Sequence, residues 1–319
     1  PIPHSPLPSY IKMNTAILKP HRLWAYLQLI RPANIVTAWA DILAGFAASE
    51  YIVITNQATA WEMNLIPLAW LLLATTGLYG GGIVFNDVFD TDLDTEERPE
   101  RPIPSGRASR RGATLLGSWL LSIGIVAASQ VSWLSAILAL GIAVAALFYD
   151  AFGKHHPIFG PVNMGICRGG NLLLGVSVLP TMVGEYWFLA LIPIVYIAAI
   201  TLLSRGEVHG AKLSTGVVAL SLIVIVISGL LGLGLFTNYQ LLTASPFLIF
   251  FTIQVLLPFI KALREPTPEK IRFAVKAGIL SLIILDTTIV AGFAGLSSGL
   301  VVLSLLPISL KLAHVFAVT

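Results

Sequence analysis

Four carboxylates and an amide lie close together in the stretch NDVFDTDLD, which covers residues 86–94. If the preceding helix continues, Asn86, Asp90 and Asp94 fall at i, i+4 and i+8, and Asp87 lies on the same face. Carboxylates stacked in this way repel one another, and a hard divalent cation relieves that repulsion. Magnesium prefers oxygen ligands and typically takes one or two carboxylates together with phosphate oxygens. The spacing therefore predicts a site for magnesium and a diphosphate.

Arginines follow the acidic stretch in the chain. Arg98 and Arg101 stand within a few residues of it, and a guanidinium can hold phosphate oxygens through two parallel hydrogen bonds. A solvated acidic loop that caps a helix is the alternative interpretation. The one-sided spacing, the start inside an apolar run and the neighbouring arginines favour the diphosphate site.

The composition indicates that the chain lies in a lipid bilayer. Of its 319 residues, 56% are hydrophobic and only 11% are charged, whereas soluble domains carry roughly 25% charged residues. The net charge of +3 gives no indication of a nucleic-acid partner. We expect an all-α membrane bundle of about nine transmembrane helices, with an N-terminal arm at 1–21, a transmembrane domain at 22–296, and an apolar segment at 297–319 that forms a further helix or a re-entrant cap. The predicted spans are 23–48, 65–86, 112–129, 131–149, 161–182, 186–204, 214–236, 243–263 and 274–296.

Lysine and arginine separate the two sides of the predicted bundle. They occur in the N-terminal arm and in the connections 87–111, 150–160, 205–213 and 261–276, whereas the alternate connections contain neither. Positive charge is enriched in cytoplasmic loops. The pattern therefore predicts a multi-pass protein whose N-terminus and basic loops are cytoplasmic, in a cell inner membrane or a thylakoid membrane.

Polar residues inside the predicted spans form a second group of candidates. A buried arginine in a span usually marks a functional cavity, and Arg168 lies one helical turn from Asn171. A structural ion pair is the alternative for Arg168, with Asp150 or the mid-span Asp41 as its partner. Asn34 belongs either to a cavity or to a hydrogen bond between packed helices. These residues therefore remain candidates for substrate binding, with packing roles as the alternative.

The acidic stretch resembles the first aspartate motif of the UbiA superfamily of intramembrane prenyltransferases, NDxxDxxxD. The family continues with RPLPSG, and this chain has RPIPSG at residues 101–106. Residues 31–34 (RPAN) are similar to the RP near the family's start. Tyr149 and Lys154 stand one residue further apart than in the family's YxxxK. The resemblance covers residues 22–296 and implies the helical fold of that superfamily.

The second aspartate motif of the family, DxxxD, is altered in this chain. The corresponding text is SRGEVHG at residues 204–210, where Glu207 takes the place of the second aspartate and an uncharged residue replaces the first. His209 is close in the sequence, and Arg205 is placed to supply part of a missing cation's charge. The strings NDVFD, HPIFGPVNMGICRGGNLLLG and SRGEVHG together resemble the EboC-like branch of the superfamily.

The resemblance implies a reaction in which an isoprenyl group moves from its diphosphate to an aromatic or other small acceptor, with Mg²⁺ as cofactor. A non-catalytic transporter or lipid-diphosphate-binding protein with the same fold is the alternative, and the altered second motif favours it somewhat. A CDP-alcohol phosphotransferase is disfavoured because the DGxxAR context is missing. The expected metal ligands are Asn86, Asp90, Asp94 and Glu207; the expected catalytic residues are Asp87, Asp90, Asp94, Glu207 and Tyr149; the expected substrate-binding residues are Asn34, Arg98, Arg101, Lys154, Arg168, Asn171, Arg205 and His209.

Overall fold

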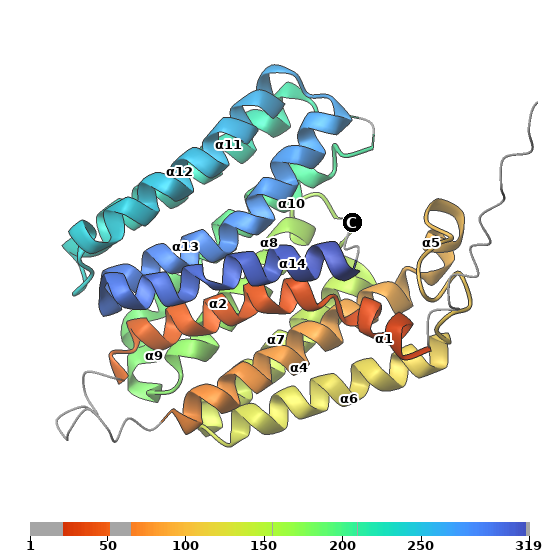
Figure 1. The fold of residues 1–319 in the computed structure, drawn as a ribbon, viewed down its shortest axis with the longest axis horizontal. Helices are drawn as coiled ribbons and strands as arrows, with labels where there is room; N and C mark the ends of the chain where they lie inside the picture. Colours follow the sequence, from red (N-terminus) through yellow and green to blue (C-terminus); the bar gives the residue numbers. More distant parts are fainter. Residues whose placement is uncertain (1–21, 52–64, 155, 209, 317–319) are drawn as a thin grey trace, which may run out of the picture.

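The computed structural model describes residues 22–51, 65–154, 156–208 and 210–316. In these ranges the chain forms helices and turns without strands, and Figure 1 shows the helices as an elongated bundle. The helices are α1 (Arg22–Ile30), α2 (Pro32–Ala48), α4 (Ile66–Phe89), α5 (Thr91–Glu97), α6 (Arg110–Ser129), α7 (Trp133–Phe148), the π-helix η1 (Tyr149–Gly153), α8 (Phe159–Val176), α9 (Pro180–Tyr186), the 3₁₀-helix η2 (Trp187–Ala190), α10 (Leu191–Ser204), α11 (Leu213–Gly232), the 3₁₀-helix η3 (Leu233–Leu235), α12 (Leu241–Arg264), α13 (Pro268–Leu303) and α14 (Leu305–Phe316).

The described residues confirm the prediction of an all-α membrane bundle. Seven helical segments among them are long and apolar enough to cross a membrane, judged by length and composition. Two further helices, α2 with 17 residues and α8 with 18, run through the middle of the bundle. Both carry buried polar residues of the interior, Asp41 on α2 and Arg168 and Asn171 on α8. The expected number of about nine spans is therefore close.

Two of the predicted spans have different boundaries in the structure. The span predicted at 23–48 is divided, because Arg31 adopts a left-handed conformation (φ 48°) and Pro32 begins a new helix. Proline disfavours the helical conformation of the residue before it and fits the first helical position. The span predicted at 161–182 ends at Val176, and residues 180–204 form the next crossing as α9, η2 and α10.

The C-terminal segment turns back along the bundle. α13 is broken at Gly295, whose φ of 86° and ψ of 168° lie in a region that glycine adopts most readily. Beyond this break the chain runs beside α2, where the Ser309 hydroxyl donates to the carbonyl of Ala33 at 3.1 Å. The rings of Trp24 and Phe316 stack at 4.7 Å. Figure 1 shows α14 alongside α2 and α13, so this segment covers the surface between those two helices.

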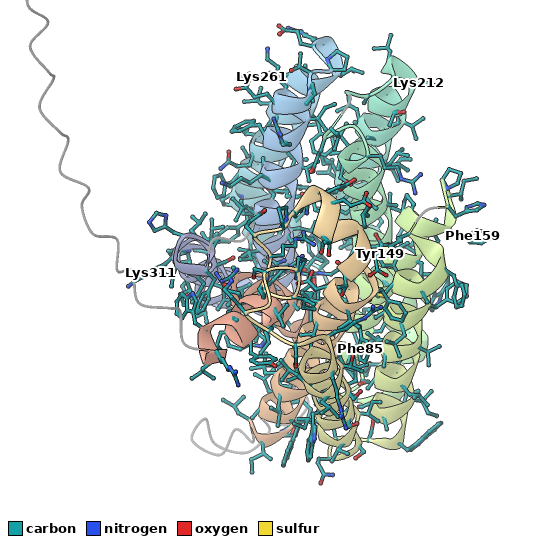
Figure 2. The ribbon with its side chains drawn as sticks, turned by 90° about the vertical axis from the view of Figure 1, so that its right-hand side faces the viewer. Phe85, Tyr149, Phe159, Lys212, Lys261 and Lys311 are labelled. Atoms are coloured by element: carbon teal, nitrogen blue, oxygen red, sulfur yellow. The ribbon has the colours of Figure 1, made fainter. Side chains whose placement is uncertain are left out.

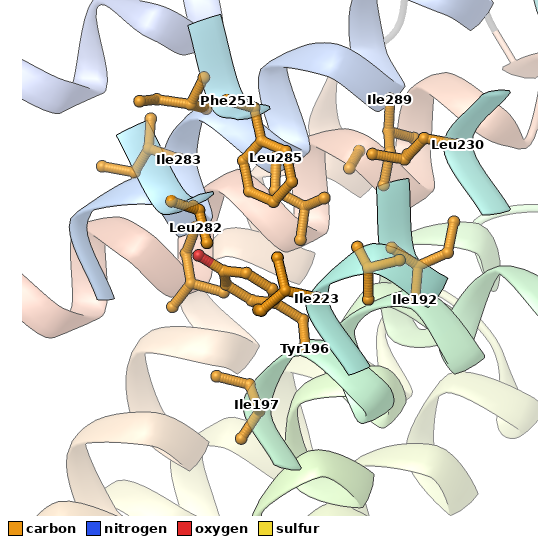
Figure 3. Close-up of a cluster of buried hydrophobic side chains, with 14 of the residues drawn as sticks. Ile192, Tyr196, Ile197, Ile223, Leu230, Phe251, Leu282, Ile283, Leu285 and Ile289 are labelled. Carbon is orange, nitrogen blue, oxygen red and sulfur yellow. The ribbon is translucent and has the colours of Figure 1, made fainter. Parts of the chain in front are cut away.

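A large apolar core joins α10 to α11, α12 and α13 (Figure 3). The rings of Tyr196 and Phe251 lie 5.4 Å apart within it. The Tyr196 hydroxyl donates to the carbonyl of Gly278 at 2.8 Å, which satisfies a polar group that cannot reach water. The core therefore fixes α13, including its polar end, relative to α10.

Glycines bring α2 and α8 into unusually close contact. A Cβ atom on Gly45 would lie 2.0 Å from the carbonyl oxygen of Leu172, and one on Gly175 would lie 2.4 Å from that of Ile42. Small residues at such positions let the backbones of membrane helices approach each other. This contact holds the polar side chains of α2 and α8 next to one another.

Candidate functional site

The acidic stretch forms the end of α4 and the short helix α5. We predicted one continuous helix, but α4 ends at Phe89 and α5 begins at Thr91, with an interruption at Asp90. The interruption is slight, because the backbone N–H groups of Asp90 and Asp94 still donate to carbonyls four residues earlier, at 3.0 and 2.8 Å. The acidic side chains therefore keep nearly the spacing that the sequence predicts.

Two arginines bind the buried carboxylates of this stretch. Arg31 Nη2 lies 2.6 Å from Asp87 Oδ1. Arg101 Nη1 lies 2.7 Å from Asp94 Oδ2 and 3.4 Å from Asp87 Oδ1. Asp87 and Asp94 are each only 4% exposed, so the guanidinium groups neutralise charges that water barely reaches. These pairs place two guanidinium groups beside the carboxylates of Asp87 and Asp94.

The π-helix η1 and the residue that follows it supply two more polar groups, Asp150 and Lys154. Lys154, directly after η1, forms an ion pair with Asp90. Asn86 Nδ2 donates to Asp150 Oδ1 at 2.9 Å, and the backbone N–H of Lys154 donates to the carbonyl of Tyr149 at 3.0 Å. Single π-helical turns often occur at functional sites. The acidic stretch of α4 and the residues of η1 thus make one polar cluster.

The sequence reasoning missed two members of this cluster, Arg31 and Asp150. Arg31 was noted only as part of a motif, although the Arg-Pro dipeptide is itself a signal for a helix break that redirects a side chain. Asp150 was considered only as a partner for Arg168. Its position between an apolar run and Lys154 repeats the pattern of the α4 acids and would have been a usable signal.

A cavity of about 240 Å³ opens beside this cluster. Asn86, Tyr149 and Asp150 line its polar end, while Asn34 and Asn171 contribute amides further along. Figure 2 looks onto this end of the bundle, with Tyr149 near its centre. The cavity therefore combines a polar mouth with an apolar body, as a ligand with a charged head and a hydrocarbon tail requires. Its apolar lining consists of Leu78, Ile83, Ile142, Ala146 and Met164.

A buried polar group connects α2 with α8 behind the cavity. Arg168 Nε lies 2.6 Å from Asp41 Oδ2, and its Nη2 donates to the carbonyl of Thr37 at 2.5 Å. Asn171 Nδ2 donates to the same Asp41 oxygen at 2.9 Å. Of the two carboxylates considered as partners of Arg168, the mid-span one is therefore its contact. Asn171 also lines the cavity, whereas Arg168 is not among the lining residues of either cavity described here.

Glu207 belongs to a second, larger cavity at the same end of the bundle. This cavity has a volume of about 810 Å³, and Arg31 and Asn34 line both cavities. Burial raises the pKa of Glu207 above its ordinary value, and the positive charges of Arg98 and Arg272 lower it by less. Arg31 and Asn34 therefore form the wall between Glu207 and the acidic stretch.

The remaining predicted residues lie at the margin of the cluster. Arg98 is exposed at the end of α5. Arg205 is also exposed, and its Nη2 donates to the carbonyls of His156 at 2.6 Å and of Lys154 at 3.4 Å. Arg205 therefore holds the loop that carries Lys154. His209 lies outside the described residues.

The acidic stretch offers oxygen ligands for a metal ion, but its side chains alone do not form a complete metal site. No three acidic, histidine or cysteine side chains in the described part of the chain are arranged to hold a metal ion. Asn86 nevertheless lines the cavity, Asp90 and Asp94 follow it in the same acidic stretch, and Mg²⁺ commonly shares its ligands between one or two carboxylates and a phosphate. The donor set therefore fits magnesium that arrives with a diphosphate.

Part of the chain is similar in sequence to known enzymes. The chain is 30% identical over 187 residues to a digeranylgeranylglyceryl phosphate synthase of Metallosphaera sedula, with 59% of this chain and 62% of the relative covered. It is 32% identical over 149 residues to the synthase of Methanothrix thermoacetophila, with 47% and 52% covered. The chain thus spans less than two thirds of the length of these relatives.

Solved structures share the fold, and a family model matches most of the chain. A UbiA homologue from Archaeoglobus fulgidus bound to GPP and Mg²⁺ superposes with a TM-score of 0.63 at 16% identity, covering 86% of this chain and 99% of that one. A structure of a digeranylgeranylglyceryl phosphate synthase gives a TM-score of 0.64 at 20% identity, with coverages of 86% and 99%. Residues 42–271, well over half of the chain, match the UbiA prenyltransferase family. The chain belongs to the UbiA prenyltransferase family.

Proposed function

We propose that the protein transfers an isoprenyl group from a prenyl diphosphate to an acceptor within the membrane, with Mg²⁺ as cofactor. The observation that carries the proposal is the cluster in which Arg31, Arg101 and Lys154 neutralise the acids of α4 and α5 beside a cavity with a polar mouth and an apolar body. Family membership supports it, as do the relatives named digeranylgeranylglyceryl phosphate synthase and the homologue bound to GPP and Mg²⁺.

Asn86, Asp90 and Asp94 would hold magnesium together with the diphosphate, and Asp87 supports them through its arginines. When bound, magnesium supplies positive charge that stabilises the leaving diphosphate. Glu207 would serve the other side of the head group from the second cavity. When the substrate and magnesium bind, the basic side chains would turn from the carboxylates to phosphate oxygens, and the metal ion would take the carboxylates that they leave.

In the reaction, the bond between the prenyl C1 and the diphosphate oxygen breaks, and its electron pair leaves with the diphosphate. Arg31, Arg101 and Lys154 stabilise that charge. A new bond forms between C1 and the acceptor, whose displaced proton passes to water at the polar end. Tyr149 lines the cavity where the allylic cation develops, and the apolar walls keep water away from it.

We further propose that the polar end of the bundle faces the cytoplasm. The connections 87–111, 150–160, 205–213 and 261–276 at this end all carry arginine or lysine, and such residues are retained on the cytoplasmic side. The strings NDVFD and SRGEVHG support membership of the EboC-like branch as a separate proposal.

Turnover by the purified protein tests the proposal. Labelled geranyl diphosphate and Mg²⁺ are supplied with a panel of acceptors, and diphosphate release and prenylated product are measured. Asp90→Asn and Asp94→Asn should each reduce product at least about a hundredfold. Asp92→Asn is the matched control, because this side chain is 89% exposed in the same stretch. Tight binding of the diphosphate without its release for any acceptor would instead establish a non-catalytic binding protein.

A further inference from the structure

The first cavity, beside the acidic stretch, ends at a similar depth on two of the helices that line it. It lies among α2, α4, α7 and α8, and each of these helices packs against the next (Figure 1). On α4 the lining residues run from Asn86 at the polar mouth to Leu78, eight residues or about 12 Å away at 1.5 Å per residue. On α8 they run from Met164 to Asn171, seven residues or about 10 Å. The cavity therefore reaches about 12 Å inward from its polar mouth.

A packed apolar core lies beyond Leu78. This side chain is 2% exposed, and Ala74 and Leu71, one and two turns further along α4, are completely buried. They belong to one cluster with Ala139 of α7 and Leu174 of α8. Of these five residues, only Leu78 lines the cavity. The Leu78 side chain is therefore the boundary between the cavity and a close-packed interior.

Asn171 closes the same end of the cavity and has no free hydrogen-bond donor. Its Nδ2 donates to the carbonyl of Ala38 and to Asp41 Oδ2, both at 2.9 Å, so both amide hydrogens are used. Its Oδ1 accepts the Thr75 hydroxyl at 2.7 Å. A buried network that is satisfied in this way is rigid. Asn171 is therefore a fixed part of the inner wall.

The gaps between the four helices are closed beside the inner part of the cavity. Between α2 and α4, Trp39 Nε1 donates to Thr76 Oγ1 at 2.9 Å. On each side of α7, a Cβ atom added to a glycine of the neighbouring helix would contact an α7 side chain, at 3.4 Å on α4 and 3.0 Å on α8. These pairs are Gly82 with Ala146 and Gly170 with Ile142. The hydrogen bonds of the inner wall already join α2 to α8, so a prenyl tail in this cavity stays among the four helices.

We propose that the inner end of this cavity limits the length of the prenyl donor, that Leu78 and Ile142 determine the limit, and that a geranyl chain is the length that fits. Leu78 is the innermost lining residue of α4, and Ile142 is that of α7. With carbon–carbon bonds of about 1.5 Å, an extended geranyl chain is about 9 Å long and a farnesyl chain about 14 Å. A geranyl tail therefore ends before Leu78, whereas the last isoprene unit of a farnesyl tail meets it. The inference rests on the proposed transfer reaction and adds the chain length of its donor.

Equilibrium binding of prenyl diphosphates with Mg²⁺ to the full chain in neutral maltoside micelles tests this inference. The Kd of farnesyl diphosphate is divided by that of geranyl diphosphate, and this ratio is compared between variants, because the partition of each tail into micelles is the same for all of them. Leu78→Ala opens space for the next isoprene unit, so the ratio should fall at least about tenfold. Leu71→Ala is the matched control, since it removes the same atoms from the same helix beyond the inner end of the cavity. It should leave the ratio unchanged.

Shortening the cavity provides a second test that does not depend on Leu78. Ile142→Phe should weaken binding of geranyl diphosphate at least about fivefold more than that of dimethylallyl diphosphate, whose shorter tail ends before this level. Ile137→Phe, at a position of α7 that is 53% exposed, should not distinguish the two ligands.

Three results would overturn the inference: a ratio unchanged in Leu78→Ala, a ratio that falls equally in Leu71→Ala, or tighter binding of geranylgeranyl than of geranyl diphosphate by the unchanged protein. Each would mean that the tail is not stopped at Leu78. Failure of every one of these diphosphates to bind contradicts the proposed transfer, whereas binding that is independent of the two cavity residues contradicts only the length limit.

Discussion

Replacing Arg168 by methionine removes the cation that neutralises a carboxylate in the middle of the bundle. Arg168 is 3% exposed, Asp41 is completely buried, and their atoms lie 2.6 Å apart. Methionine fills a similar volume, so the substitution removes the positive charge with little change in packing. Breaking a buried ion pair from one side costs about 3–5 kcal/mol, because the remaining charge has no partner and no water.

A third buried side chain makes the loss of Arg168 more costly than the loss of Asp41. Asp286 of α13 is 1% exposed, interacts with the Asp41 carboxyl group and lies within electrostatic range of Arg168. Asp41→Asn leaves Arg168 with Asp286 as a counter-charge, so it should cost only about 1–2 kcal/mol. Arg168→Met leaves two carboxyl groups without a cation and should cost at least about 3 kcal/mol.

The free energy of unfolding in mixed detergent micelles measures both effects, with loss of helical circular dichroism as the signal. The double variant Asp41→Asn/Arg168→Met should be at least about 1 kcal/mol more stable than the sum of the two single changes indicates, because removing both members of the ion pair leaves neither of them without its partner. Equal costs for the two single variants, or strict additivity in the double variant, would refute this account of the cluster.

Three further predictions concern packing and the polar loop. Gly45→Ala should lower the free energy of unfolding by about 1–3 kcal/mol, since its Cβ would press on the backbone of α8; Gly141→Ala, with no atom within 4 Å of the new Cβ, should be neutral or stabilising by up to about 1 kcal/mol. Tyr196→Phe should cost about 1 kcal/mol in the same unfolding assay, because it removes the buried hydroxyl that donates to α13. Arg205→Gln should release the loop that carries Lys154, which predicts faster hydrogen exchange there and a KM for prenyl diphosphate raised about three- to tenfold. An unchanged KM with faster exchange would show that the loop's order is irrelevant to substrate binding.

The apolar runs predicted most of the fold, because a bilayer demands long helices and leaves few alternatives. The break at Arg31 also had a local signal in the following proline. The turn at Gly295 did not, since the surrounding segment contains several glycines and only the packing of the returning helix on α2 selects one of them. The structure places α9 and η2 within the crossing at 180–204, a boundary that hydropathy alone does not fix.

The candidate site was predictable where its residues are neighbours in the sequence. The acids of α4 and α5 share a helical spacing, so their gathering follows from the helix period. Their basic partners do not: Arg31 is 56 residues from Asp87, and Lys154 is 64 residues from Asp90. Only the packing of α2, α4 and η1 brings these groups together. The second cavity was not predictable either, because it exists only when α14 folds back.

The dependence of prenyl diphosphate binding on magnesium tests the central claim most directly. The measurement is the equilibrium Kd of geranyl diphosphate for the purified chain, with Mg²⁺ and with a chelator, for the unchanged protein, Asp94→Asn and Asp92→Asn. The account predicts that the chelator and Asp94→Asn each raise the Kd at least about tenfold, and that Asp92→Asn leaves it unchanged. A Kd that is the same with and without Mg²⁺, and the same in Asp94→Asn, would contradict the assignment of the acidic stretch as the magnesium–diphosphate site.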